Sequence, residues 1–317
     1  MKNIITTFCL IVLISCGAEN DESSIIENDL TSLNLKGNVK EYSLNEYEIK
    51  SYKFGEPEYE PISSSTFYFN SYGFGYKYKD TSHSYYNDTK FLAEESIDFQ
   101  DSINGLISKR VYERENYKLV QFYEYDSLSK KIVKVKNFNT EDGPPEIKSY
   151  EYGDSTTKIS TYDELGELKR LVMEKYDDSK KPISVITYDK DGQISDETYH
   201  SYFDDGSKKD SVNNKYSSFN FIFTILYDDK DRIIKETDYE DYGSVKIKGS
   251  YREYDDGNFN SSYDKFVFEG KDGKVVEKLR VSKSYDEIGN VIEEVTTNME
   301  NDKIVEKKEY SYKYFSN

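Results

Sequence analysis

Apolar and polar side chains alternate along much of the chain, which is the pattern of an extended strand with two different faces. In residues 275–285, Val275, Leu279 and Val281 fall on one face, and lysine, arginine and serine fall on the other. Residues 304–314 repeat this pattern with tyrosine as the main apolar residue. Segments with this period of two predict β-strands throughout the chain.

A short unit separates many of these strands: an aromatic residue, an aspartate, a polar stretch and often a glycine. The aspartate can accept a hydrogen bond from the backbone N–H two residues later, and glycine adopts the positive φ that tight hairpins need. The tyrosine ends the incoming strand, where its ring packs across to a neighbour. The most complete copies are formed by Tyr162, Asp163 and Gly166; by Tyr188, Asp189 and Gly192; and by Tyr285, Asp286 and Gly289.

These hairpins predict one all-β domain over residues 31–317. Because the spacing between turns varies, we expect antiparallel hairpins of unequal length that form a long twisted or curved sheet, or an open β-shell. Asn104-Gly105 predicts a hairpin turn, and the apolar residues 219–226 predict a central strand that is paired on both sides. The polar segment 207–218 is predicted to be a long loop.

The first residues are typical of a secretory leader, because Lys2 is followed by a short apolar stretch. This stretch ends in Leu13-Ile14-Ser15-Cys16, which resembles a bacterial lipobox. The resemblance implies that residues 1–15 are a signal peptide and that Cys16 carries acyl chains such as palmitate. The chain would then be anchored by lipid and not by a membrane span. Residues 16–30 would form the lipidated cysteine and a flexible acidic tether.

The repeated Tyr-Asp turn resembles that of the YD-repeat (RHS-like) family, and most of all its small lipoproteins from Bacteroidota. The segment Leu33-Asn34-Leu35-Lys36-Gly37-Asn38-Val39-Lys40 also looks like the opening of such proteins. The resemblance covers roughly residues 33–317. It implies a β architecture more than a biochemical activity. The acidic residues Glu19–Glu22 resemble a surface-export signal of lipoproteins from the same bacteria.

The net charge and the cysteine count limit the kinds of partner and site that the chain can have. The net charge is −18, whereas nucleic acids and polybasic membrane contacts require a basic surface. We therefore expect no nucleic-acid partner. Cys9 leaves with the leader, and acylation of Cys16 would leave no free thiol for a disulfide, a nucleophile or a thiolate metal site.

The sequence contains no recognised catalytic or phosphate-binding motif, and its only histidines are His83 and His200. In an extended strand His200 shares a face with Tyr202, so we interpret it as a residue of the sheet. The acidic turns, such as Asp189–Gly192, carry oxygen atoms of the kind that bind calcium. Hydrogen bonding within the turn is enough to explain why these acidic residues are present. We expect no catalytic residue, no metal and no cofactor.

These patterns favour a non-catalytic outer-membrane lipoprotein at the cell surface, held by its N-terminal lipid. It would act as an interaction or scaffold module whose tyrosine-rich sheet face contacts a surface protein or a glycan. One alternative is a polysaccharide-binding lipoprotein, because tyrosine rings stack on sugars, although the chain has no tryptophan. A second alternative is an enzyme like a glycoside hydrolase that uses acidic residues.

Overall fold

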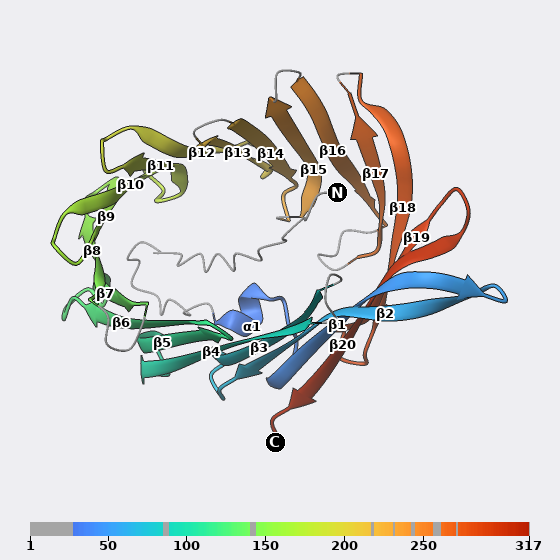
Figure 1. The fold of residues 1–317 in the computed structure, drawn as a ribbon, viewed down its shortest axis with the longest axis horizontal. Coiled ribbons are helices and arrows are strands. Elements are labelled where there is room, and N and C mark those ends of the chain that lie inside the picture. The colour runs from blue at the N-terminus through green and yellow to red at the C-terminus, as the bar shows by residue number, and fades with distance from the viewer. Residues whose placement is uncertain are drawn as a thin grey trace.

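The computed structural model describes residues 28–84, 89–139, 144–216, 219–230, 232–241, 245–255, 261–270 and 272–316. These residues form one short helix, α1 (Asp29–Ser32), and twenty β-strands (Figure 1). No helix among them is long and apolar enough to cross a bilayer. The strands in chain order are β1 (Val39–Lys53), β2 (Glu56–Phe69), β3 (Gly75–Ser84), β4 (Thr89–Asp101), β5 (Leu106–Arg114), β6 (Tyr117–Tyr125), β7 (Ile132–Phe138), β8 (Glu146–Tyr152), β9 (Thr156–Tyr162), β10 (Leu168–Tyr176), β11 (Pro182–Asp189), β12 (Ile194–Tyr202), β13 (Lys208–Tyr216), β14 (Phe219–Tyr227), β15 (Ile233–Asp241), β16 (Val245–Tyr254), β17 (Tyr263–Glu269), β18 (Lys274–Tyr285), β19 (Val291–Asn298) and β20 (Lys303–Tyr314).

The strands form a closed up-and-down barrel. Each strand pairs antiparallel with the next one, from β1–β2 to β19–β20. The ring closes because β20 pairs with β1, with Tyr42 opposite Tyr312 and Leu44 opposite Tyr310. The prediction of an all-β array of antiparallel hairpins is confirmed. The prediction of an open sheet or shell is wrong: pairing of the first and last strands satisfies the backbone groups that both edges would otherwise expose.

The barrel has two rims, each made of turns. The N-terminal rim holds the turns that follow even-numbered strands, together with the start of β1 and the end of β20. The distal rim holds the turns that follow odd-numbered strands, including the β1–β2 turn at Phe54-Gly55. The wall is not equally tall, because β1 has 15 residues whereas β7, β8 and β9 have 7 each.

Helix α1 lies inside the ring of strands and shows which side chains point inwards (Figure 1). Leu30 of α1 forms a small buried core with Val39 and Phe69. Tyr42, Phe67 and Tyr312, among others, pack against this core, so their side of the sheet is the inner wall. Because side chains alternate along a strand and opposite residues of paired strands point the same way, the pairing assigns other positions to the inner or the outer wall.

Three local expectations have clear outcomes. Residues 207–218 were expected to be a loop, but β13 occupies most of this segment and pairs with both β12 and β14. The prediction failed because both walls of this barrel carry polar side chains, so a polar segment can be a strand. Strand β14 covers residues 219–226 and pairs with β13 and β15 as predicted. Asn104-Gly105 lies in the β4–β5 turn, where Gly105 has φ of +66°.

Candidate functional site

The residues of the three Tyr-Asp units lie in separate turns. Two units form the β9–β10 and β11–β12 turns on the distal rim, and the third forms the β18–β19 turn on the N-terminal rim. The structure therefore does not bring them together into one site. Their glycines have φ of +81°, +76° and +91° at Gly166, Gly192 and Gly289.

In each unit the aspartate side chain stabilises the turn by accepting hydrogen bonds from backbone N–H groups of the same turn. Asp163 Oδ1 accepts hydrogen bonds from the N–H groups of Leu165 and Glu167, both at 2.9 Å. Asp189 Oδ1 accepts in the same way from Asp191 and Gln193, at 2.9 and 2.8 Å. Asp286 Oδ1 accepts from Ile288, Gly289 and Asn290 at 2.9, 2.7 and 2.8 Å. All of these carboxylates are engaged by their own turns, which is a structural role.

Tyrosines at the ends of even-numbered strands have a structural role that the sequence analysis missed. Each hydroxyl donates to the carbonyl oxygen of a residue at the start of the preceding strand, which ties the two strands together at the N-terminal rim. The distances are 2.7 Å for Tyr125 to Ile107, 2.8 Å for Tyr152 to Ile132, 3.0 Å for Tyr202 to Pro182, 3.0 Å for Tyr254 to Ile233 and 2.6 Å for Tyr312 to Val291. The signal was present in the sequence as a recurrent separation of 18 to 21 residues between the partners.

The inner wall combines stacked aromatic rings with partly buried ion pairs. The ring of Tyr42 stacks on those of Phe67, Tyr310 and Tyr312, with centroids 5.4, 6.1 and 5.5 Å apart. Burial raises the pKa of Tyr78, on the same wall, to about 12. The tyrosines of this cluster therefore face the lumen and line a packed surface, not an open outer face.

The inner ion pairs are well shielded from solvent. Lys283 Nζ lies 3.6 Å from Glu294, and their side chains are only 14% and 17% exposed. Lys308 Nζ lies 2.8 Å from Glu46. Burial alone would raise the pKa of Glu46, but hydrogen bonds from Lys308 and Ser63 outweigh it and hold this pKa below its usual value.

His200 belongs to the same wall. Its Nδ1 lies 2.6 Å from Asp210 Oδ1 across the β12–β13 pair. This contact explains a histidine in a strand without any catalytic role. Within the described part of the chain, no group of three or more histidine, cysteine, aspartate or glutamate side chains could hold a metal ion. Cys16 and the acidic residues 19–22 lie outside the described residues.

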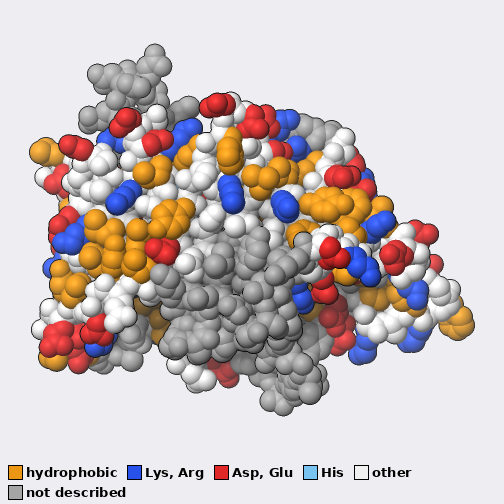
Figure 2. All heavy atoms as spheres, turned by 90° about the horizontal axis from the view of Figure 1, so that it is seen from above, with side chains coloured by type: hydrophobic (Ala, Val, Ile, Leu, Met, Phe, Trp, Pro, Cys, Tyr) orange, Lys and Arg blue, Asp and Glu red, His pale blue; other side chains and the backbone are white. Residues whose placement is uncertain are grey.

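The outer wall carries ion pairs with exposed side chains. Lys158 Nζ lies 3.2 Å from Glu151, and their side chains are 39% and 64% exposed. Similar pairs on other strands join Lys77 to Glu94, Lys136 to Glu124, Arg280 to Asp264 and Lys313 to Glu41. In the part of the wall that Figure 2 colours, charged side chains stand between the hydrophobic groups. Among the described residues this wall has no continuous apolar belt.

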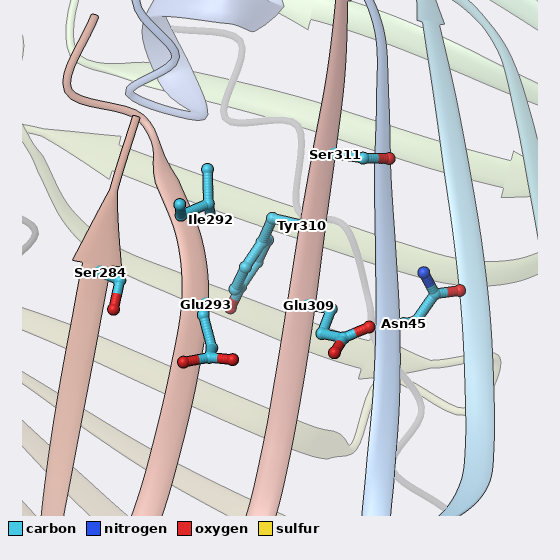
Figure 3. A pocket seen from close by; sticks show the side chains of 7 residues that line it. All are labelled: Asn45, Ser284, Ile292, Glu293, Glu309, Tyr310 and Ser311. Atoms are coloured by element: carbon cyan, nitrogen blue, oxygen red, sulfur yellow. The ribbon is translucent and has the colours of Figure 1, made fainter. Parts of the chain in front are cut away.

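A shallow depression of about 400 Å³ lies on the outer wall where β18, β19, β20 and β1 meet (Figure 3). It follows one cross-strand row, in which Ser284, Glu293, Glu309 and Asn45 are successive partners. Ile292, Tyr310 and Ser311 complete its lining.

The two carboxylates of the depression share one cation. Lys307 Nζ lies 2.9 Å from Glu293 and 2.8 Å from Glu309. The hydrogen bond from Lys307 is the main reason why the pKa of Glu309 lies below its usual value. Glu309 also accepts a hydrogen bond from the Tyr47 hydroxyl at 3.3 Å. The depression therefore offers carboxylate and hydroxyl groups, which suits hydrogen bonding to a polar ligand.

Two solved structures show a distant similarity to this chain. One is a porin-like protein from Bacteroides uniformis with a TM-score of 0.38 and 11% identity, which covers 87% of this chain and 98% of that one. The other is a porin-like protein from Bacteroides vulgatus with a TM-score of 0.30 and 12% identity, which covers 66% of this chain and 98% of that one. No protein-family model and no curated protein matches the chain. Scores this low do not establish a shared fold.

Proposed function

We propose that this protein is a non-catalytic, lipid-anchored barrel of the outer membrane at the cell surface. Its wall stands in water and acts as an interaction or scaffold surface. The observation that carries the proposal is the outer wall, where the side chains of ion pairs such as Lys158–Glu151 and Lys136–Glu124 are exposed. A protein whose wall is wetted needs another anchor, and acyl chains on Cys16 would supply it.

Charged residues are energetically costly on the lipid-facing side of a membrane barrel. A lysine or arginine there costs about 2–4 kcal/mol at the bilayer midplane. The described outer wall has cations on many strands, among them Lys136, Lys158, Arg280 and Lys307. Together these residues would oppose insertion strongly, whereas in water exposed ion pairs are nearly neutral for stability.

Fractionation tests the anchor in cells that express the full chain and its Cys16→Ala variant, the variant being placed behind a leader that is cleaved without lipidation. The proposal predicts that the natural chain stays with the outer membrane through salt and carbonate washes, and that the variant is released in soluble, folded form. Retention of Cys16→Ala in the washed membrane would contradict the proposal, because the wall itself would then be the anchor.

A second candidate function is glycan binding at the outer depression. It is favoured by the row of Asn45, Glu293 and Glu309, with the Tyr47 hydroxyl on Glu309. Hydrolysis is less favoured there, because a general acid needs a raised pKa and that of Glu309 is lowered. A glycan array screened with the full chain and with Glu309→Gln tests this candidate, with Glu151→Gln on another part of the outer wall as the control. A saturable signal that Glu309→Gln reduces and Glu151→Gln preserves would support binding at the depression.

A further inference from the structure

Four exposed apolar residues occupy the same position in four turns of the N-terminal rim. They are Tyr72, Ile103, Leu128 and Ile288, with exposed fractions of 48%, 62%, 91% and 47%. We infer that this apolar arc rests on the surface of the lipid bilayer. The inference builds on the proposed lipid anchor and adds the orientation of the barrel on the membrane.

The turns hold these side chains in a fixed way. The backbone N–H of each arc residue donates to Oδ1 of an asparagine or aspartate two positions earlier. The distances are 3.0 Å for Tyr72 to Asn70, 3.0 Å for Ile103 to Asp101, 3.1 Å for Leu128 to Asp126 and 2.9 Å for Ile288 to Asp286. The polar atoms are satisfied within the turn, and the apolar side chain is left at its tip.

The four turns form one continuous sector of the rim. They are the β18–β19, β2–β3, β4–β5 and β6–β7 turns, and only the paired ends of β20 and β1 lie between the first two. Elsewhere on this rim the equivalent position is polar: Asp205 in the β12–β13 turn, and Lys230 after Asp228. Phe203 is also exposed there, but it precedes its turn aspartate. At this turn position the apolar residues are thus gathered on one side of the rim, whereas exposed rings elsewhere on the rim, such as Tyr152 and Tyr202, lie at strand ends.

The described chain begins at this sector of the rim. This position favours the bilayer that holds the N-terminal lipid as the surface that contacts the arc. Asn28 Nδ2 donates to the Tyr72 carbonyl oxygen at 2.9 Å, and the Leu30 N–H donates to Gly73 at 3.2 Å. Further along the same segment, the Lys36 N–H donates to Asn290 Oδ1 at 2.7 Å, beside Ile288. Cys16 precedes Asn28 by twelve positions. Twelve residues span at most about 40 Å, so a lipid on Cys16 keeps this end of the barrel close to the bilayer.

The chemistry of the arc suits the interface between headgroups and acyl chains. Aliphatic and tyrosine side chains are the residues that enter this region, while the backbone of a satisfied turn stays with the headgroups. The arc has only four apolar side chains, so it would orient a protein that is already anchored and would not anchor it alone.

Tryptophan reporters test the inference cleanly, because the chain has no tryptophan of its own. Leu128→Trp places a reporter on the arc. Leu165→Trp is the matched control: Leu165 lies on the distal rim, is 79% exposed, and its N–H donates to Asp163 Oδ1 at 2.9 Å. Both variants are prepared as acylated full-length protein on phosphatidylethanolamine–phosphatidylglycerol vesicles, with and without brominated acyl chains, which quench nearby tryptophan.

We expect brominated lipid to lower the emission of Leu128→Trp about twofold and to leave that of Leu165→Trp unchanged, because only the first reaches the acyl boundary. Acylated, vesicle-bound protein with unquenched Leu128→Trp, or with equal quenching of both, would overturn the orientation and leave the lipid anchor standing. A change in Leu128→Trp emission with protein concentration and not with lipid would assign the arc to a second copy of the chain and overturn the inference. If the protein carries no acyl chains on Cys16, both the lipid anchor and the orientation are overturned.

Discussion

The inner and outer walls of the barrel contain similar residues but place them in different surroundings. Both carry lysine–glutamate pairs and tyrosines. On the inner wall Lys283 and Glu294 are almost enclosed, whereas on the outer wall Lys158 and Glu151 are largely in water. In a barrel that spans a membrane the outer wall is the apolar one. Here the buried apolar cluster of Leu30, Val39 and Phe69 lies inside.

This difference implies that the inner wall contributes mainly to stability and that the outer wall is available for binding. Residues of the inner wall have few exposed atoms, and their loss leaves cavities or unpaired charges. The exposed charged residues of the outer wall make contacts that water can replace, so they are free to change and to meet partners, whereas a few apolar residues of that wall, such as Val120, are buried. Paired substitutions, one on each wall, test this division.

The largest effect is expected from the inner core. Phe69 is 2% exposed and packs against Leu30 of α1, so Phe69→Ala should lower the free energy of unfolding by about 3–4 kcal/mol. Phe122→Ala, at a 42% exposed position on the outer wall, should cost less than about 1 kcal/mol. Urea denaturation followed by circular dichroism measures both. Equal losses would contradict the division between the walls.

The next effect concerns ion pairs. Lys308→Met leaves Glu46 without its cation on the inner wall and should cost about 2–3 kcal/mol, below the value for a fully buried pair because both side chains keep about a quarter of their surface in solvent. Lys158→Met on the outer wall should cost less than about 0.5 kcal/mol. The same denaturation measurement compares them, and a loss for Lys158→Met as large as that for Lys308→Met would show that the outer pairs are also structural.

A smaller effect is expected at the tyrosines that tie strands together. Tyr312→Phe removes one hydrogen bond, 2.6 Å long, to the Val291 carbonyl oxygen and should cost about 1 kcal/mol. Tyr199→Phe removes an exposed hydrogen bond to Glu197 and should be close to neutral. Hydrogen exchange at the start of β19 provides a local readout, since faster exchange there is expected for Tyr312→Phe alone.

The smallest effect is on the pH dependence of stability. The pKa of folded Glu46 lies below its ordinary value of 4.5, so its contribution is fully present above that value and is lost as pH falls through the lower folded pKa. Glu46→Gln should therefore reduce the difference between urea midpoints at about pH 6 and about pH 3.5. An unaltered pH profile for Glu46→Gln would show that the Lys308 contact does not favour the ionised carboxylate.

Local features of the fold were readable from the sequence, and long-range ones were not. The alternation of residues and the hydrogen-bonding capacity of Asp163 depend only on neighbouring residues, and they identified strands and turns. Closure depends on contacts such as that between Glu41 and Lys313, which are 272 positions apart. No local pattern indicates whether two strands so far apart will pair or remain edges.

Two other features were not predicted from the sequence, for physical reasons. Helix α1 is only four residues long, and the sequence analysis placed Asp29 and Leu30 in the tether. The signal was Asn28, whose side chain caps the helix by accepting from the Thr31 N–H at 3.0 Å. The depression near Glu293 and Glu309 could not be foreseen, because it depends on the register of four strands.

The central claim is that the outer wall stands in water, and one reporter on that wall tests it directly. Phe122→Trp, in acylated full-length protein bound to vesicles, places the only tryptophan of the chain on the outer wall within β6. The account predicts emission typical of a water-exposed indole and no quenching by brominated acyl chains. Strong quenching with blue-shifted emission would show that the wall is embedded in lipid, and would contradict the account.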